Sequence, residues 1–357
     1  MRLAPAIRLL MMLERGRLPP ANNADVAVER IRWRRVVAAG LLTIGAIWWL
    51  IELAGNLYWA PANLANDFWT YRQAGINILL GHAVYSAAEM ARPFILPSAA
   101  WGKGFVYPPP AALASVPLAL PAPALGYLAY SVFTAAALIA VTVSIARREG
   151  LTGRRWAAVV AFLSLANGPA IGALASGNLN GLVAASLGLM WLTPRRSGYL
   201  AVLGGLVKLF PAAGLAWTLR KRGQLAGPIV LGVILLAITL LVLGFQPWLD
   251  FVDVMHNARP SSPYYVQSVA RVFGPAVGYA SSIAFLALVL TVRDDAVSFA
   301  LLSLAMIAPA PDLVPHYMLI PMMGVLPLVS RSVARATGHA PAAAPPSNTT
   351  ITAPAPS

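Results

Sequence analysis

Long apolar stretches with few or no charges dominate this chain. A helix needs about 20 apolar residues to cross the roughly 30 Å of hydrocarbon in a bilayer. Apolar residues make up 59% of the chain and charged residues only 11%, whereas about a quarter of a soluble domain is charged. We therefore predict an all-α, polytopic membrane protein. The apolar stretches are 36–51, 123–146, 156–194, 223–249, 272–292 and 296–329, the last with Asp312 inside it.

The basic residues predict the direction in which the chain threads the membrane. Of the 26 Lys and Arg residues, 20 lie in short segments beside the apolar stretches, and eight of these fall in the first 35 residues. Short cytoplasmic loops carry such an excess. We therefore expect a multi-pass plasma-membrane protein with both termini in the cytoplasm and two long outer loops, 57–107 and 246–274. The net charge of +14 then marks the cytoplasmic face and does not indicate nucleic-acid binding.

Three parts are predicted along the chain. Residues 1–35 form a basic cytoplasmic segment, 36–335 a transmembrane domain, and 336–357 a disordered cytoplasmic tail rich in Ala and Pro. The transmembrane domain is expected to hold about eight full spans together with shorter pieces. Cysteine is absent, which excludes disulfides and thiolate metal sites.

The shorter pieces are predicted where polar residues or prolines interrupt apolar sequence. Residues 156–193 are expected to form a hairpin that turns at Ser176–Gly181. Residues 197–220 must start and finish at the same face, so we predict a re-entrant pair of half-helices broken at Lys208–Pro211, shielded from lipid. Residues 108–120 are too short and too rich in proline for a full crossing and are predicted to be interfacial or re-entrant.

Three polar residues stand out because they lie at the edge of apolar sequence or within it. Desolvation among Trp59, Trp69 and Tyr71 would favour proton uptake by Asp67 near neutral pH, which suits a general base; the alternative is an ordinary interfacial acid at a helix start. His316 is a functional candidate or a residue of the aromatic belt at the interface. A lysine at membrane depth, Lys208, indicates function unless it snorkels to the nearby cytoplasmic face.

Other kinds of site are excluded by inspection. The chain has no glycine-rich nucleotide loop before a strand–helix unit and no His/Asp cluster with metal-ligand spacing. Use of ATP or of a nucleotide sugar is therefore not expected, and neither a metal ion nor another cofactor is predicted.

Seven short motifs follow one another along the chain: Asp67-Phe-x-x-Tyr71, Gly81-x-x-x-Tyr85, Tyr107-Pro-Pro109 with Pro117-Leu118, Gly177-Asn-x-Asn180, Lys208-x-x-Pro211, Gln267-Ser268 and His316-Tyr317. In this order they resemble glycosyltransferase family 87 over about residues 35 to 330. That family of GT-C-type membrane enzymes includes the mannosyltransferases of phosphatidylinositol mannoside synthesis that use polyprenyl-phosphate mannose. The chain departs from the family pattern at Asn178, where glutamine is usual, and in lacking a tryptophan just before His316.

The resemblance implies inverting transfer of a sugar, with mannose as the leading candidate, from a polyprenyl-phosphate donor to a lipid or glycan hydroxyl outside the membrane. It implies that Asp67 is the general base and that His316 helps to hold the donor phosphate or the base. Lys103 and Arg259 are candidate phosphate contacts in the outer loops. The other candidate substrate- or phosphate-binding residues are Arg72, Tyr71, Tyr85, Tyr107, Asn178, Asn180, Lys208, Gln267, Arg271 and Tyr317.

Two other classes of protein remain open from the sequence. A transporter or flippase would place paired polar residues at the membrane midplane in two related halves, and no internal repeat is visible. If the chain were a non-catalytic assembly protein, Asp67 would have no evident function.

Overall fold

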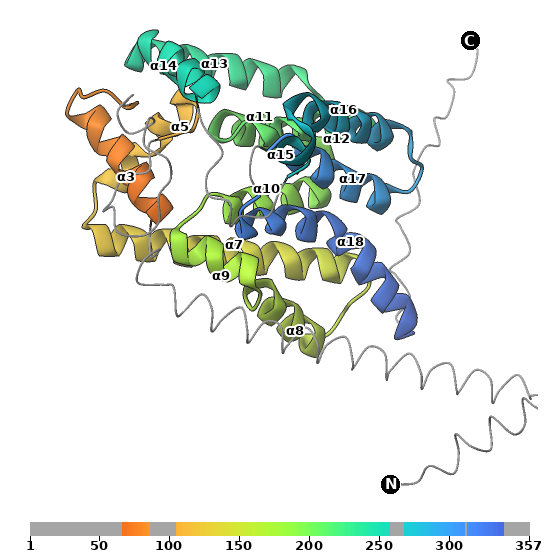
Figure 1. Ribbon diagram of the computed structural model, residues 1–357. Coiled ribbons are helices and arrows are strands. Elements are labelled where there is room, and N and C mark those ends of the chain that lie inside the picture. Colours follow the sequence, from red (N-terminus) through yellow and green to blue (C-terminus); the bar gives the residue numbers. More distant parts are fainter. Residues whose placement is uncertain (1–65, 86–104, 258–267, 311–312, 339–357) are drawn as a thin grey trace, which may run out of the picture. The chain divides into compact units, whose positions relative to one another are not determined.

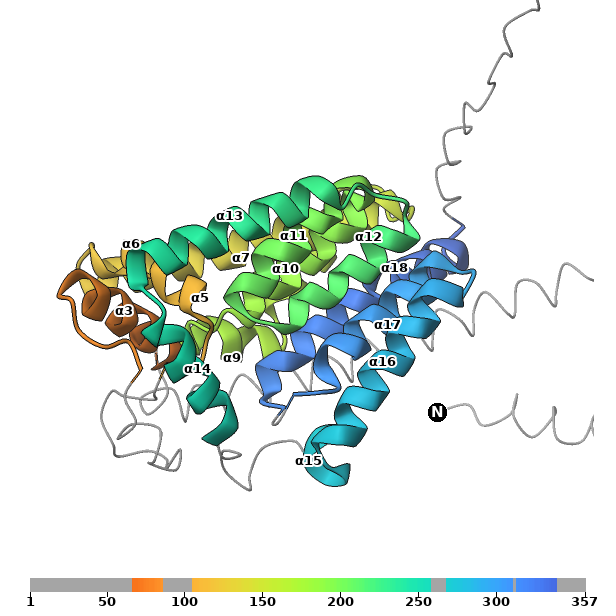
Figure 2. The same ribbon diagram turned by 90° about the horizontal axis from the view of Figure 1, so that it is seen from above.

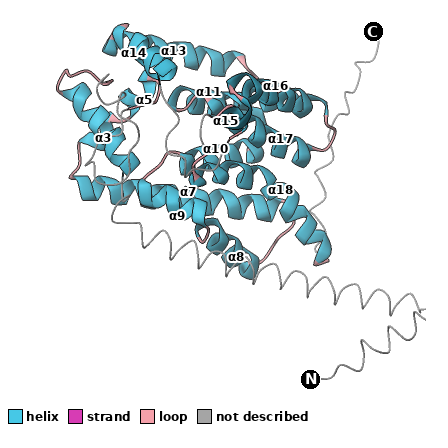
Figure 3. Ribbon diagram, in the orientation of Figure 1, coloured by secondary structure: helices cyan, strands magenta, loops and turns pink. Residues whose placement is uncertain are grey.

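The structure is a computed structural model, and it describes residues 66–85, 105–257, 268–310 and 313–338. These residues form α-helices, short 3-10 helices and connecting loops, with no strand element among them (Figure 3). The prediction of an all-α fold is confirmed for this part of the chain. The predicted first span at 36–56 and both terminal segments lie outside the described residues.

Helices of very different length make up the fold (Figure 1). The α-helices are α3 (Asn66–Leu79), α5 (Pro109–Ala114), α6 (Val116–Ala119), α7 (Pro123–Arg148), α8 (Arg154–Leu165), α9 (Gly168–Ser176), α10 (Asn180–Leu192), α11 (Ser197–Val207), α12 (Gly214–Arg220), α13 (Ala226–Leu243), α14 (Gln246–Asn257), α15 (Val269–Phe273), α16 (Pro275–Thr291), α17 (Asp295–Ile307) and α18 (Leu319–Ala336). The 3-10 helices are η1 (Pro194–Arg196), η2 (Phe210–Ala213) and η3 (Pro315–Met318).

Three of the described helical segments are long and apolar enough to cross a membrane: α7, α13, and η3 continued by α18. The pair α8 and α9 also qualifies if its 59° bend is counted as a break within one span. Helices α10, α16 and α17 are apolar but shorter. About eight full spans are therefore not confirmed in the described residues, because several apolar stretches fold as short or broken helices.

The central helices pack side by side around one apolar core. Helix α10 contacts α7, α11 and α18, while α17 packs between α16 and α18 (Figure 2). Trp191 on α10, Trp217 on α12 and Phe299 on α17 meet in this core with ring centroids 5.0–5.6 Å apart. Buried residues of α9, α10 and α11 belong to this core.

The predicted interruptions occur where polar residues, glycine and proline stand. The chain turns between α9 and α10 at Gly177–Leu179, within the predicted hairpin tip. Helix α11 ends at Val207, and α12 begins after Lys208 and the 3-10 turn η2. The far ends of α11 and α12 lie together, because Ser197 Oγ and Thr218 Oγ1 are 2.9 Å apart. The segment 197–220 is therefore a helical hairpin with its tip near Lys208.

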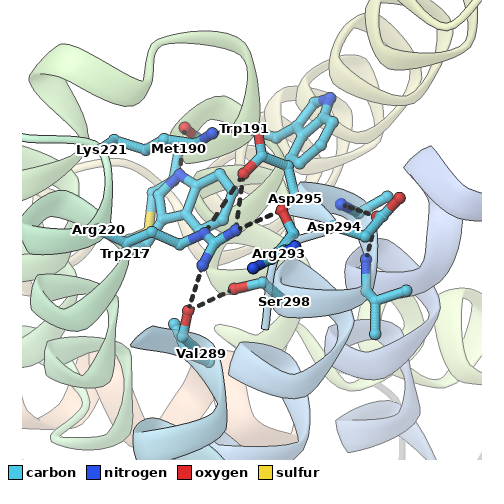
Figure 4. A network of polar contacts seen from close by, with 12 residues as sticks. Met190, Trp191, Trp217, Arg220, Lys221, Val289, Arg293, Asp294, Asp295 and Ser298 are labelled. Carbon is cyan, nitrogen blue, oxygen red and sulfur yellow. Dashed lines mark hydrogen bonds and ion pairs between the residues drawn. The ribbon is translucent and has the colours of Figure 1, made fainter. Parts of the chain in front are cut away.

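Many of the basic residues predicted to be cytoplasmic gather at the other end of these helices. Arg148 donates to the carbonyls of Trp191 and Leu192 at 2.9 and 3.0 Å, and Arg331 pairs with Glu149. Figure 4 shows the adjoining network, in which Arg220 and Lys221 both pair with Asp295. Buried aromatic rings connect the two groups, since Lys221 lies over Trp217 and Arg331 over Trp191.

Candidate functional site

The candidate site begins at the first turn of α3. Asp67 stands there, where the positive end of the helix dipole favours a carboxylate. Asn178, from the turn between α9 and α10, donates from Nδ2 to Asp67 Oδ2 over 2.9 Å. The other end of the Asn178 amide is also engaged, because Oδ1 accepts the Asn180 backbone N–H at 2.8 Å. Both polar atoms of this amide thus hold the carboxylate against the start of α10.

Glycine at position 177 makes this approach possible. Gly177 has φ of +68°, in the left-handed region that glycine adopts at little cost. A Cβ at this position would lie 2.6 Å from Phe68 Cβ, which is closer than carbon atoms can pack. The absence of a side chain therefore lets the first turn of α3 lie directly on the loop that carries Asn178.

A second polar pair continues from Asn178 into the hairpin formed by α11 and α12. Lys208 Nζ donates to Asn180 Oδ1 over 2.6 Å. The ammonium also lies over three aromatic rings, with its nitrogen 5.5 Å from the centroid of Tyr107, 5.2 Å from Phe210 and 4.5 Å from Tyr317. Cation–π attraction compensates in part for the water that a buried ammonium loses. The side chains of Lys208 and Asn180 are both buried. Lys208 therefore points into the same site as Asp67.

Buried tyrosines form one wall of the site. The hydroxyls of Tyr71 and Tyr107 are 2.8 Å apart, and Tyr71 also accepts the Leu179 backbone N–H at 3.3 Å. Tyr85 donates to the Tyr107 carbonyl at 2.7 Å. Burial raises the pKa of the Tyr71 and Tyr107 hydroxyls well above the usual range, and the nearby Asp67 carboxylate adds to the effect. Both tyrosines therefore stay neutral at any physiological pH.

His316 and Tyr317 reach the site from η3, which packs against α9. Their rings are stacked, with centroids 5.6 Å apart, and Tyr317 is the ring nearest to Lys208. The His316 side chain is buried. His316 therefore contacts Tyr317, and Tyr317 in turn contacts Lys208.

Arg72, one of the predicted site residues, contacts backbone carbonyls and an aromatic ring. Its guanidinium donates to the carbonyls of Ala119 and Pro121, both at 3.3 Å, and lies 5.7 Å from the Trp69 ring centroid. These contacts fasten α3 to the chain that follows α6, and a phosphate contact stays a prediction. Arg271 lies in α15, whose Ser268 cap accepts its backbone N–H, and its predicted role is likewise untested. The candidates Lys103, Arg259 and Gln267 lie outside the described residues.

Two residues at the site were not singled out in the sequence. Tyr130 on α7 is buried and interacts electrostatically with Asp67. Its hydroxyl has no hydrogen-bond partner within the described ranges. Phe210 forms part of the aromatic surroundings of Lys208. The motif that contains Lys208 and Pro211 would have drawn attention to Phe210, but no local pattern marks Tyr130.

The described residues contain no group of three or more His, Asp or Glu side chains placed to hold a metal ion. The expectation that no divalent metal is required stays a prediction, which activity measured with and without a chelator would check.

The fold and the site together define a helical membrane protein with a buried site in which a carboxylate, two amides and a lysine converge. The model of glycosyltransferase family 87 matches residues 105–330. The chain therefore belongs to glycosyltransferase family 87, a family of membrane glycosyltransferases. The matched region includes Asn178, Asn180, Lys208 and His316, whereas Asp67 precedes it. No curated protein and no solved structure matches the chain.

Proposed function

We propose that this protein transfers a sugar from a polyprenyl-phosphate donor to a hydroxyl of a lipid or glycan acceptor, at the extracytoplasmic face of the plasma membrane. Mannose is the leading candidate for the sugar. The observation that carries this proposal is the contact between Asn178 and Asp67 in a site that also holds Lys208. Such a site offers a proton acceptor for the acceptor hydroxyl and a cation for an anionic leaving group.

Each residue has a distinct task in the proposed reaction. Asp67 accepts the proton of the acceptor hydroxyl as its oxygen attacks the anomeric carbon of the sugar. The bond from that carbon to the phosphate oxygen breaks, polyprenyl phosphate leaves, and attack from the opposite side inverts the configuration. A fixed cation stabilises the charge that develops on the leaving group in a site of low polarity. His316 helps to hold the donor phosphate or the base.

The separation of polar groups along the helices supports the proposed sidedness. Asp67, Asn180 and Lys208 lie at one end of the helices that carry them or adjoin them, while the cluster around Arg148, Arg220 and Arg331 lies at the other end. Cytoplasmic loops are enriched in arginine and lysine. The site therefore faces away from the predicted cytoplasmic side, as a lipid-linked donor outside the cell requires.

The test is an assay of the purified protein in nanodiscs with a series of sugar donors. We expect release of polyprenyl phosphate and incorporation of the sugar into a component of a membrane extract, with polyprenyl-phosphate mannose as the best substrate. Matched nucleotide sugars should not serve as donors. Transfer from a nucleotide sugar at an equal rate would contradict the proposal. So would movement of a lipid-linked sugar across the membrane without transfer, which is the transporter alternative.

A further inference from the structure

Asn180 carries a buried donor that lacks an acceptor. Its side chain is fully buried, and within the described part of the chain Nδ2 has no hydrogen-bond partner. An ammonium group can only donate hydrogen bonds, so the contact with Lys208 requires the amide oxygen of Asn180 to face the lysine. The amide nitrogen, Nδ2, is therefore the atom of this amide that has no partner among the described residues. Most buried polar groups in native proteins have a hydrogen-bond partner, and one that is left over calls for an explanation such as a bound ligand, ion or water.

Lys208, which contacts Asn180, also has unused hydrogen-bond donors. Of the three N–H groups of an ammonium, the described residues engage one, through Asn180 Oδ1. Nζ also lies over the faces of Tyr107, Phe210 and Tyr317, and it interacts electrostatically with the Asp67 carboxylate. Aromatic faces attract the positive charge, but they offer no lone-pair acceptor. The charge of Lys208 is therefore held in place without being neutralised by them.

The two donors are neighbours, because Asn180 Nδ2 shares its carbon with the oxygen that accepts from Lys208. Asn180 is also the first residue of α10, where the positive end of the helix dipole favours an anion. We propose that Asn180 Nδ2 and Lys208 Nζ together bind phosphoryl oxygens of the lipid-phosphate donor. The identity of the anion rests on the function proposed above, whereas the need for an acceptor at this point rests on the contacts alone.

This assignment distinguishes one pair from the several basic residues considered earlier. Arg72 donates from Nη2 to two carbonyls, although its Nε also has no partner among the described residues. The unused donors of Asn180 and Lys208 differ in that they belong to two side chains that contact each other. The pair is also connected to Asp67, since the Asn180 backbone donates to Asn178, which in turn donates to the carboxylate. The phosphate subsite and the base are thus held by the same turn between α9 and α10.

Binding of two lipids that differ only in the phosphate tests the assignment. The dissociation constants of polyprenyl phosphate and of the uncharged polyprenol are measured in nanodiscs for the wild type, Lys208→Met and Asn180→Asp. Methionine keeps most of the length of lysine without charge, and aspartate replaces the free donor by an oxygen. The wild type should prefer the phosphate, and each variant should lower that preference about ten- to hundredfold, as expected for a lost hydrogen bond to a charged group. Binding of the polyprenol should stay unchanged.

Matched controls come from a lysine and an asparagine outside the turn between α9 and α10. Lys221 also lies over an aromatic ring, 4.9 Å from the centroid of Trp217, and Asn167 caps α9 through Ala170. Lys221→Met and Asn167→Asp should keep the wild-type preference for the phosphate. Binding of the polyprenol and thermal unfolding report whether each variant is folded. Asn180→Ser, which also removes the amide, replaces Asn180→Asp if that variant does not fold.

Two outcomes separate this inference from the function on which it rests. A wild-type protein that binds the phosphate no better than the alcohol would refute the lipid-phosphate donor, and the proposed function with it. A wild-type preference that survives in folded Lys208→Met and in the folded Asn180 variant would overturn the subsite and leave the proposed function standing.

Discussion

Asp67 and Asn178 are 111 residues apart in the sequence, yet their side chains share a 2.9 Å hydrogen bond. The amide is itself fixed by the Asn180 backbone, so it can orient one oxygen of the carboxylate. A general base must hold its oxygen within hydrogen-bond reach of the proton that it abstracts. At the scale of single residues, we therefore propose that Asn178 is a positioning residue for Asp67.

Replacing Asn178 by leucine tests this role. Asn178→Leu keeps a similar volume but removes the donor, so we expect the rate of sugar transfer to fall about ten- to hundredfold, in line with a lost hydrogen bond to a charged group. The KM for the donor should change less than kcat. Asn77→Leu is the control, because that amide accepts from Gln73 on α3 and donates to the Ala83 carbonyl in the loop after α3. A wild-type rate for Asn178→Leu would show that the contact has no catalytic importance.

The sequence identified many residues of the site but few of their relationships. Asn178, Asn180, Lys208 and Tyr317 were predicted as binding residues, and the structure brings them together with Asp67. The order of motifs could not show that Asn178 contacts Asp67, because the contact depends on how α3 packs against the turn after α9. Arg72 is a second example. Its side chain donates to the backbone carbonyls of Ala119 and Pro121, and a sequence motif does not indicate which backbone carbonyls a side chain will contact.

At the scale of elements, the junction of α3 with the turn after α9 depends on Gly177. Gly177→Ala would place a Cβ 2.6 Å from Phe68 Cβ and would hold alanine at an unfavourable φ, which itself costs about 1–2 kcal/mol. We expect lower thermal stability together with a loss of activity of at least about tenfold, because a small displacement of catalytic groups is costly.

Gly81 offers a control with the same backbone geometry. Its φ is +69°, and a Cβ there would meet no atom within 4 Å. Gly81→Ala therefore carries the conformational cost without the collision and should retain more activity than Gly177→Ala. Equal activity of the two variants would indicate that the close approach of α3 to the turn is not needed.

Breaks between helices also explain why about eight full spans are not confirmed in the described residues. The apolar stretch 156–194 carries no charge, yet it folds as α8, α9 and α10, of 12, 9 and 13 residues. Asn167 caps the start of α9 and Gly177 ends it. A capping residue and a glycine therefore divide the stretch into three helices. Apolar composition predicts burial in a membrane or a core, whereas caps and glycines decide where each helix ends.

At the scale of the whole molecule, the helices carry two polar ends, for which we propose different roles. The end around Arg220 and Asp295 is a structural network, which Figure 4 shows with Ser298 and Val289. Asp295→Asn removes the charge that pairs with Arg220 and Lys221, and we expect it to lower the free energy of unfolding by about 1 kcal/mol, because Asp295 is partly exposed to solvent. Thermal unfolding in detergent measures this, and kcat of the folded protein should stay within about twofold of the wild-type value.

Asp294→Asn is the matched control. Asp294 caps α17 by accepting from the backbone of Ala296 and Val297, and asparagine caps helices about as well as aspartate. Its stability should therefore stay close to that of the wild type. If Asp295→Asn is as stable as Asp294→Asn, the network around Arg220 does not stabilise this end.

The predicted sidedness can be tested because the wild-type chain has no cysteine. Leu80, after α3, and Arg195, in η1, are both exposed. With an impermeant thiol reagent, Leu80→Cys should be labelled in intact cells, whereas Arg195→Cys should be labelled only after the cytoplasmic face is opened. The reverse pattern would place the site around Asp67 on the cytoplasmic side and contradict the proposed location of the reaction.

The central claim is that Asp67 takes the proton of the acceptor hydroxyl, and the rate of sugar transfer by Asp67→Asn tests it most directly. Asparagine keeps the size of the side chain, and its amide oxygen can still accept from Asn178, but it cannot take up a proton. The rate should fall by about 10²–10⁴-fold, the usual contribution of general-base catalysis, while polyprenyl phosphate still binds with near wild-type affinity. Transfer within about tenfold of the wild-type rate would contradict the assignment of Asp67 as the base.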